Sequence, residues 1–494
     1  MRHTKLLLLV IVSTILAGAL FASRRPLYGG TLRVEMRERV NSMDPRDWKG
    51  GELDAAAADR LLGLVFDRLV RLDDAGQAQP GLAASWQHDG NFTHWQFQIR
   101  AGVKFHDGTA VTPSDVAAAL QADDAERWTA SASIASVAFE FKVPRPNLLI
   151  ELATGRSFIF HLSGETVFGT GAFRIADWQP QKRLVLIASE DCWAGRSFVD
   201  RIEVGFGVAP QQQLVDLDLG RADVVEVLPN LTRRVSQATA RVMASAPVDL
   251  LALVVNPNAN AKAAPAGDAA PDTRLAQALS LAIDRAAIVN VLLQKQGEPA
   301  GSLLPQWLSG YAFLFPTTPN IAQAKQLVQD RQHTGQVSNM RQMALVYDGA
   351  DSIAATVAER IAVNARDAGI TLTVSAEKQG AASSKAELRL VRWRIDVPDA
   401  QQALQDFLAR EGIMQVSAAP MAIDSPEQRY AAERAAVDGG GIVPLVFLPE
   451  IFALGPAVRD WMPPRWGGWR LEDVWLDTTM RGTVAGAGGG TGNN

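Results

Sequence analysis

Along most of this chain, short runs in which hydrophobic and polar residues alternate are followed by longer segments in which hydrophobic residues recur at helical spacing. Side chains of a strand point to two faces in turn, whereas a helix carries an apolar stripe that repeats every three to four residues. The N-terminal half is thereby predicted to contain the strand Thr31–Met36, the helix Ala55–Val70, a strand pair within Ala84–Ile99, and the pair Gly171–Ala176 and Leu184–Ala188 around the turn Gln179–Lys182. Such alternation of strands and helices is typical of α/β lobes.

The C-terminal half continues this alternation with longer helices. Apolar residues at helical spacing predict one amphipathic helix over Leu275–Leu293. A buried strand, Met343–Tyr347, is followed by the predicted helix Ile353–Ala368. Gly369 is expected just past that helix, because glycine adopts a left-handed conformation without a steric penalty. The next strand is expected at Ile370–Val374.

The stretch GVKFHDGTAVTPSDVAAAL, residues 102–120, combines a turn with a helix start. Asp107-Gly108 is typical of a tight turn, since glycine accepts a positive φ. Thr112 is predicted to cap a helix that begins at Pro113, with Asp115 at the third helical position. These residues are therefore interpreted as structural, and function must come from elsewhere.

The two ends of the chain carry signals of a different kind. Arg2 and Lys5 precede the apolar run Leu6–Phe21, which is typical of a secretory signal. Cleavage after the small residues around Ala17-Gly18-Ala19, within a signal segment of residues 1–22, is favoured over an uncleaved membrane anchor. At the other end, the glycine-rich segment 485–494 is predicted to be disordered.

Composition limits the function classes. Hydrophobic residues make up 47% and charged residues 20% of the 494 residues, as in globular proteins that can bury more than one core. The formal net charge of −5 and the absence of a basic patch argue against nucleic acid as a partner. Cys192 is the only cysteine, which excludes an internal disulfide and a cysteine-based zinc site. No cofactor is expected.

Seven sequence blocks, in order, resemble the family 5 solute-binding proteins of bacterial ABC importers, which include peptide, dipeptide and nickel receptors. The blocks are GGTLRVEM…NSMDP (29–45), VFDRLVRL…KFHDG with the stretch that follows it (65–120), GTGAFRIADWQPQKRLVL (169–186), FVDRIEV (198–204), RLAQALSLAIDRAAIV (274–289), GSLLP (301–305) and VPLVFLPEIFALGPAV (443–458). Together they span almost the whole chain after residue 29.

This resemblance implies an α/β fold with two lobes, the type II, cluster C form of the periplasmic binding proteins, with an extra insert domain. Mapped onto this sequence, the first lobe comprises residues 29–48, 167–258 and 471–484, the insert domain 49–166, and the second lobe 259–470. The Ala-, Pro- and Gly-rich segment 257–271 is expected to cross between the lobes.

The segment RWRIDVPDAQQAL, residues 392–404, holds the first candidate site. In a strand Val391–Asp396, Asp396 would share a face with Arg392 and Arg394. The family often has W-x-x-D-Y-x-D-P here, and in its peptide receptors the aspartate pairs with the ligand's α-amino group while the tryptophan walls a side-chain pocket. The resemblance carries these roles to Asp396 and Trp393.

Two alternatives stay open at this site. Asp396 could instead be neutralised by Arg392 or Arg394, as buried carboxylates must be paired, and Trp393 could be an ordinary core residue. The chain also departs from the family pattern, with Val397 for the aromatic, Ala400 for the proline and Ala403 for a further aromatic residue.

The loop Asp47–Gly51 is the second candidate. In the family this region leaves the first strand beside the ligand, and its backbone bonds to extended ligands. Gly50 would allow a ligand backbone to approach closely, and Trp48 could stack on a ligand side chain. The alternative is a plain loop between lobes with a structural tryptophan.

Other signals are interpreted as structural. Gly169-Thr170-Gly171 lacks the spacing of a phosphate-binding loop, and His88, His94 and His106 lack a metal-binding arrangement. Glu450 and Asp284 are interpreted as caps or surface charges, and Trp461, Trp466, Trp469 and Trp475 as packing for the return of the chain to the first lobe.

The sequence therefore predicts a monomeric, periplasmic or otherwise extracytoplasmic binding protein rather than an enzyme. It would hold a small, peptide-like ligand between two lobes and deliver it to an ABC transporter permease. One alternative is a binding module reused as a sensor or periplasmic chaperone without transport. The enzyme-class alternative is a hydrolase, although no nucleophile and base can be named.

Overall fold

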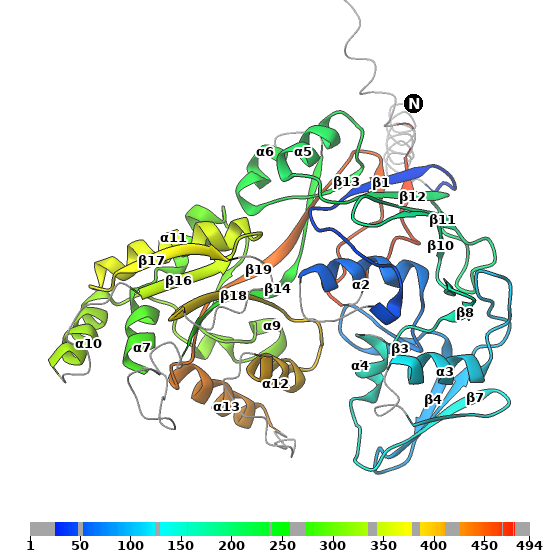
Figure 1. The fold of residues 1–494 in the computed structure, drawn as a ribbon, viewed down its shortest axis with the longest axis horizontal. Coiled ribbons are helices and arrows are strands. Elements are labelled where there is room, and N and C mark those ends of the chain that lie inside the picture. Colours follow the sequence, from blue (N-terminus) through cyan, green and yellow to red (C-terminus); the bar gives the residue numbers. More distant parts are fainter. Residues whose placement is uncertain are drawn as a thin grey trace, which may run out of the picture.

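The computed structural model describes residues 25–47, 53–123, 129–155, 157–236, 240–256, 273–333, 343–377, 386–410, 425–466, 468–477 and 479. Two bodies lie side by side and are joined by a pair of long strands (Figure 1). The predicted signal segment, the loop Trp48–Gly51, the crossing segment 257–271 and the glycine-rich tail lie outside the described residues.

One mixed sheet runs through both bodies. Its strand order is β10-β11-β12-β1-β13-β19-β14-β18-β16-β17, with β15 paired to β19. The strands are β1 (Thr31–Glu35), β10 (Phe173–Gln179), β11 (Arg183–Ala188), β12 (Arg201–Gly205), β13 (Val224–Glu226), β14 (Arg241–Val255), β15 (Glu298–Pro299), β16 (Met343–Asp348), β17 (Leu372–Glu377), β18 (Leu388–Arg394) and β19 (Ile442–Leu454). The sheet therefore ties the two bodies together through β14 and β19.

The two crossing strands are interrupted where they pass between the bodies. Pro247 of β14 lies opposite Pro449 of β19, and the register shifts on both sides of Pro247. Neither proline nitrogen can donate a hydrogen bond, so the ladder between the strands is weakest at this point. Ser245 partly compensates, because its Oγ accepts a bond of 2.9 Å from the backbone nitrogen of Glu450.

Most of the smaller elements of the first body lie between residues 53 and 168. A four-stranded sheet has the order β4-β5-β7-β6 and is joined by the two-stranded pairs β2-β3 and β8-β9. The elements are β2 (Val70–Leu72), β3 (Ala78–Pro80), β4 (Ala83–His88), β5 (His94–Ile99), β6 (Ala130–Ala132), β7 (Ser136–Glu140), β8 (His161–Ser163), β9 (Thr166–Phe168), η1 (Pro45–Asp47), α2 (Leu53–Val65), α3 (Pro113–Asp123), α4 (Leu148–Ala153), α5 (Pro210–Asp218), η2 (Pro229–Leu231) and α6 (Thr232–Ser236).

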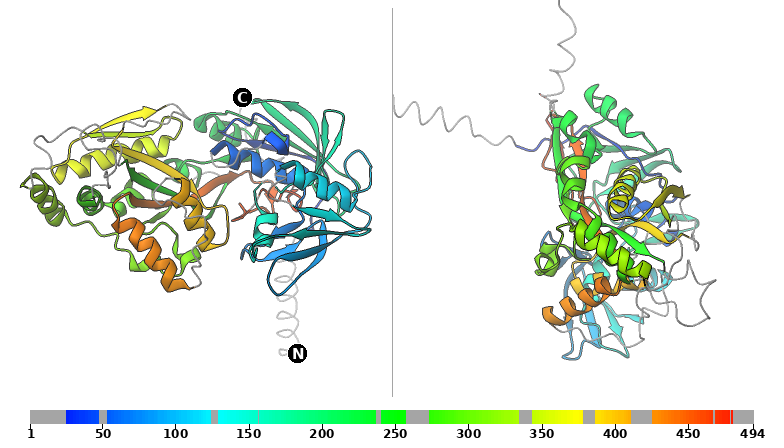
Figure 2. Two further views of the ribbon diagram at one scale, coloured as in Figure 1. Left: turned by 60° about the horizontal axis from the view of Figure 1, so that its bottom comes forward. Right: turned by 90° about the vertical axis from the view of Figure 1, so that its left-hand side faces the viewer.

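Helices cover both faces of the sheet in the second body (Figure 2). They are α7 (Thr273–Ala282), α8 (Arg285–Ala287), η4 (Ile288–Leu292), α9 (Gln306–Ser309), η5 (Ala312–Leu314), α10 (Ile321–His333), α11 (Ser352–Asp367), α12 (Ala400–Arg410) and α13 (Pro426–Asp438), and the short strands β20 (Val458–Arg459) and β21 (Trp475–Leu476) follow. Along β14, Leu251 and Leu253 pack in the core that contains α7 and α11, whereas Leu250 and Ala252 pack in the core that contains α12. This alternation is the reason for two helical layers.

The local sequence signals around α3 are confirmed. Thr112 Oγ1 accepts a bond of 3.2 Å from Asp115 N, and Asp115 Oδ2 accepts one of 2.9 Å from Thr112 N, so the two residues form a reciprocal cap. Gly108 and Gly369 have the expected positive φ of 89° and 88°. All four tryptophans of the C-terminal return are at most 5% exposed, as expected for packing residues. They are Trp461, Trp466, Trp469 and Trp475.

Several predicted elements need correction, among them the strand Gly171–Ala176, which is found at Phe173–Gln179. The predicted helix Leu275–Leu293 is broken, because Asp284 accepts a bond of 2.8 Å from Ala287 N and starts a new helix there. Helix α2 ends at Val65, and Val70 belongs to β2 instead. The strand expected from Ile370 begins at Leu372. The segment boundaries of the lobes and insert stay a prediction.

Within the described part of the chain, no single helix is long and apolar enough to cross a membrane. Two consecutive helical segments, 273–282 and 285–292, reach the required length and apolar composition only when they are counted together, and they meet at an angle of 50°.

Gly169 and Gly171 confirm the structural interpretation of the Gly-Thr-Gly segment. A Cβ atom at Gly169 would lie 2.0 Å from Val65 O, and one at Gly171 would lie 2.6 Å from Leu64 O. The segment is therefore pressed against the end of α2, where only glycine fits.

Replacement Gly169→Ala should accordingly destabilise the protein by about 3 kcal/mol or more, because the clash is with backbone atoms that cannot rotate away. Thermal unfolding followed by calorimetry measures the effect. Gly90→Ala is the matched control, since a Cβ there meets nothing within 4 Å. Equal melting temperatures for the two variants would contradict the packing described.

Candidate functional site at the junction of the two lobes

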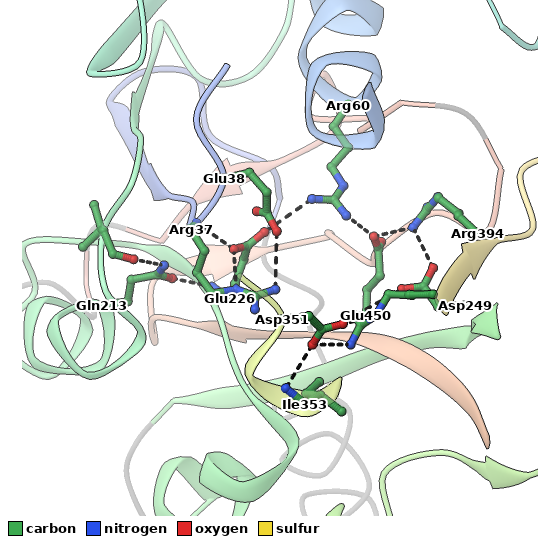
Figure 3. Close-up of polar contacts among 12 residues, drawn as sticks. Arg37, Glu38, Arg60, Gln213, Glu226, Asp249, Asp351, Ile353, Arg394 and Glu450 are labelled. Carbon is green, nitrogen blue, oxygen red and sulfur yellow. Dashed lines mark hydrogen bonds and ion pairs between the residues drawn. The ribbon is translucent and has the colours of Figure 1, made fainter. Parts of the chain in front are cut away.

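Arg60 of α2 joins two buried carboxylates from different parts of the sheet (Figure 3). Its Nη1 lies 3.3 Å from Glu226 Oε1 at the end of β13, and its Nη2 donates to Glu450 Oε1 on β19. The side chains of Glu226 and Glu450 are only 6% and 9% exposed. Burial alone would lower the pKa of Arg60, but the two carboxylates raise it, so this guanidinium stays charged.

Glu450 continues the chain of charges toward the second lobe. Its Oε1 accepts a bond of 2.5 Å from Arg394 Nη1, at the end of β18. Burial would raise the pKa of Glu450, but Arg394 and Arg60 together lower it to about 2. Glu450 is therefore a buried anion held between two cations, one from each side of the junction.

Two more acids lie beside β18, on the second-body side of the crossing strands. Asp249 of β14 lies 3.6 Å from both Arg394 Nη1 and Arg392 Nη1. Arg392 Nε lies 2.8 Å from Asp351 Oδ2. Asp351 also caps α11, because its Oδ1 accepts bonds of 2.9 and 3.0 Å from Ile353 N and Ala354 N.

The first lobe contributes a pair of acids beside one arginine. Glu226 Oε2 accepts bonds of 2.8 and 3.0 Å from the backbone and side chain of Arg37, and Arg37 Nη2 lies 3.6 Å from Glu38 Oε1. Burial and the neighbouring Glu38 raise the pKa of Glu226 to about 7, against the attraction of Arg37 and Arg60. We call the nine residues Arg37, Glu38, Arg60, Glu226, Asp249, Asp351, Arg392, Arg394 and Glu450 the junction network.

Asp396 lies two residues beyond the end of β18 and stays outside the junction network. Its side chain is exposed, and its carboxylate is affected by a hydrogen bond from its own backbone and by the charges of Arg394 and Arg410, whereas no ion pair to it is found among the described residues. Loss of hydration among the surrounding protein atoms nevertheless raises its pKa, and the charge of Arg394 opposes that rise. Asp396 is therefore a carboxylate that water reaches and whose pKa is raised by the protein around it.

Asp396 makes no ion pair with Arg392 or Arg394 among the described residues, because both arginines are bound to other acids, Asp351, Asp249 and Glu450. The charge of Arg394 still acts on the Asp396 carboxylate, so its neutralisation by this arginine stays an alternative. The strand also ends at Arg394, earlier than predicted.

Trp393 is placed behind this strand face rather than on it. It is 3% exposed, and its ring centroid lies 4.5 Å from that of Phe407 on α12. Trp393 is thus a core residue that packs beneath the backbone segment containing Arg394 and Asp396. Trp48 and Gly50 lie outside the described residues, so their role stays a prediction.

The segment after Asp396 touches the first body. A Cβ built at Gly76, in the turn between β2 and β3, would lie 2.4 Å from Pro398 Cβ. Gly76 has a φ of 78°, so glycine satisfies both the turn and the close approach. Asp396 therefore stands in a segment of the second lobe that touches the first.

Glu450 is the residue that the sequence interpretation missed. It was expected to be a cap or a surface charge, yet it lies at the centre of the junction network. Its partners Arg60 and Arg394 are 390 and 56 residues away in the chain. One signal was available, because Glu450 is a charged residue inside an otherwise apolar strand, where an acid must be paired if it is buried.

Other clusters in the described residues show no sign of chemistry. No group of three or more His, Cys, Asp or Glu side chains in that part of the chain could hold a metal ion. A polar cavity of about 80 Å³ beside the end of α2 is lined in part by Asp67, Arg71 and Glu472. Asp67 there is already bonded to Arg71 at 2.8 Å and to Trp193 Nε1 at 2.8 Å.

This architecture, two α/β lobes joined by crossing strands with charged side chains at their junction, defines a two-lobed binding protein. Structures of that type match it over nearly their whole length. The ABC transporter-associated periplasmic binding protein DppA of Helicobacter pylori, in complex with peptide STSA, matches with a TM-score of 0.72 and 17% identity over 91% of this chain and 98% of its own. The NikA protein of Staphylococcus aureus, in complex with Ni(L-His)2, matches with a TM-score of 0.72 and 16% identity over 90% of this chain and all of its own.

The chain belongs to the bacterial extracellular solute-binding proteins of family 5, whose model matches residues 77–415. Among curated proteins, heme-binding protein A of Haemophilus influenzae is 23% identical over 297 residues, which is 50% of this chain and 52% of that protein. The chain spans 31% to 64% of the length of the first curated relatives that it matches. Proteins of this family are extracytoplasmic binding components of ABC importers, as the resemblance predicted.

A second acid pair at the edge of this region makes stability depend on pH. Burial, the charge of Asp216 and a hydrogen bond to it raise the pKa of Glu35, at the end of β1, to about 7. Because the raised pKa belongs to the folded protein, the folded state binds the proton more tightly than the unfolded chain. The stabilisation is complete below the unfolded pKa near 4.5 and is lost as the pH rises through about 7.

Replacement Glu35→Gln should therefore raise stability at pH 8 by about 1 kcal/mol, allowing for the water that reaches this side chain, and change it little at pH 5. Melting temperatures from pH 5 to pH 8 test this. The control is Glu140→Gln, an exposed acid on β7, which should reproduce the wild-type pH profile. An identical profile for Glu35→Gln and wild type would refute the assignment.

Proposed function

We propose that this protein binds a small, peptide-like solute between its lobes, pairs the solute's amino group with Asp396, and delivers it to an ABC transporter permease. The observation that carries the proposal is the Asp396 carboxylate, which is exposed at the lobe junction and unpaired among the described residues while both neighbouring arginines are engaged. A free carboxylate with a partly lost hydration shell favours a cationic partner.

The crossing strands support a mechanism of lobe closure. Pro247 and Pro449 remove ladder bonds at the point where β14 and β19 pass between the bodies, so bending there breaks few interactions. Binding then needs only a higher affinity for the closed arrangement, and no covalent chemistry. The solute would be released unchanged to the permease.

Three of the solved neighbours support an amino-acid-based ligand, whereas NikA of Brucella suis holds Fe(III)-EDTA. Solved relatives of the same fold hold the peptide STSA, the dipeptide Met-Leu and the complex Ni(L-His)2. These ligands are built from amino acids, and peptides carry a free amino group. We extend that chemistry to this chain because Asp396 matches the family's amine-binding aspartate.

Native mass spectrometry of the full-length protein, purified without denaturation, tests the proposal. Wild type should carry a fraction heavier by the mass of a small ligand, and the released ligand should contain a reactive amine. Asp396→Asn should bind that ligand 10- to 150-fold more weakly, because a charge-assisted hydrogen bond contributes about 1.5–3 kcal/mol. Its melting temperature should not fall, since no ion pair to Asp396 is found within the described part of the chain.

Asp438→Asn is a matched control, because Asp438 is an exposed acid on α13 that pairs only with Arg434 in the described structure. It should retain ligand as wild type does. Wild-type affinity in Asp396→Asn would reject Asp396 as a ligand contact. Conversion of the released solute on incubation with the protein would instead favour the hydrolase alternative, and binding without any effect on uptake would favour a sensor.

A further inference from the structure

Arg394 and Asp396 stand close together yet do not pair. They are two residues apart, with Arg394 the last residue of β18 and Asp396 just beyond the strand. Alternate residues of an extended chain are about 7 Å apart, a distance that an arginine side chain spans. In the structure, Arg394 instead points to Glu450, with 2.5 Å between Nη1 and Oε1, and its other acidic neighbour is Asp249 at 3.6 Å. The arginine side chain is long enough to reach Asp396, so distance does not prevent this ion pair. We attribute its absence to competition between the carboxylates for Arg394.

Glu450 wins this competition because it is fixed in place. Its backbone nitrogen is bonded to Ser245 Oγ at 2.9 Å, and Arg60 holds its carboxylate from the first-lobe side. The Glu450 side chain is 9% exposed, whereas Asp396 is exposed to water. An ion pair with a buried, rigid anion is stronger than one with a hydrated carboxylate that must give up water and side-chain freedom.

Asp249 could not hold Arg394 equally well alone. It lies 3.6 Å from Arg394 and from Arg392, so two guanidinium groups already share its charge. Without the charge of Glu450, the positive charge of the half-buried Arg394 would be only partly neutralised, by Asp249. The nearest unpaired acid on its own strand face is Asp396.

We propose that Glu450 is a positioning residue of the ligand site: by holding Arg394 at the junction, it keeps the Asp396 carboxylate free for the cationic group of a ligand. This inference rests on the proposed function, in which Asp396 receives that group. Arg394 is then a built-in competitor of the ligand, and Glu450 together with Arg60 keeps it away. The charge preference of the site is thus set by a residue that does not contact the ligand.

The test uses a probe that needs no ligand. Carbodiimide activation with glycine ethyl ester labels accessible carboxyl groups of the full-length protein, and peptide mass spectrometry reports the extent at Asp396. Glu450→Gln should lower Asp396 labelling about three- to five-fold relative to wild type, because the released Arg394 covers the carboxylate. Adding Arg394→Met to that variant should restore wild-type labelling.

The double variant Glu450→Gln with Arg60→Met is the matched control. It removes the other arginine that holds Glu450, and Asp396 labelling should stay low because Arg394 is still present. If Glu450→Gln does not yield folded protein, Glu450→Asp makes the same comparison, since it keeps the buried charge but withdraws it from Arg394. Wild-type labelling in Glu450→Gln, or low labelling that persists after Arg394→Met, would overturn the inference.

Ligand retention separates this inference from the proposed function. If both hold, Glu450→Gln retains less of the natural ligand and Arg394→Met restores retention in that background. If Asp396→Asn binds ligand as wild type does, the proposed amine contact fails whatever the labelling shows. If Asp396→Asn loses ligand but Glu450→Gln labels as wild type, only the positioning role of Glu450 fails.

Discussion

The ion pairs that Arg60 and Arg394 make with Glu450 are the interaction on which the rest of the junction depends. Glu450 stands on β19 directly after Pro449, where the ladder between the crossing strands is interrupted. A buried anion at such a point would be costly without partners, and removing one partner of a buried pair costs about 3–5 kcal/mol. At the crossing point, these ion pairs therefore hold the strands together in place of the backbone hydrogen bonds that do so elsewhere in the sheet.

The charge balance of the junction network is nearly neutral. Among the described residues it contains the arginines 37, 60, 392 and 394 and the acids 38, 226, 249, 351 and 450. The acids exceed the arginines by one, and the raised pKa of Glu226, beside Glu38, allows one proton to make up the difference. Asp396 lies outside this balance, and in the proposed function its carboxylate receives the cationic group of the ligand.

Much of the local structure could be predicted from the sequence, because its causes are local. The cap Thr112–Asp115, the glycine at position 369 and the alternation of Arg392, Trp393 and Arg394 all follow from residues within a few positions of one another. Asp284 does cap a helix, one of the two roles the sequence suggested for it, but the break in the helix there was not predicted, because the apolar stripe continues across it.

The candidate site was predictable only in part. The position of Asp396 followed from a short motif, but its freedom from Arg394 did not, because that depends on Glu450, 56 residues away from Arg394. Pairing partners so distant in the chain leave no periodic signal. Burial of Glu450 within an apolar strand was the one hint, and it did not identify the partner.

Small-angle X-ray scattering of the full-length protein, before and after its own released ligand is added back, tests the central claim most directly. If the lobes close over the solute about the proline-interrupted strands, the radius of gyration should fall when ligand saturates the protein. An unchanged radius of gyration, with binding confirmed in the same sample, would contradict closure at this junction.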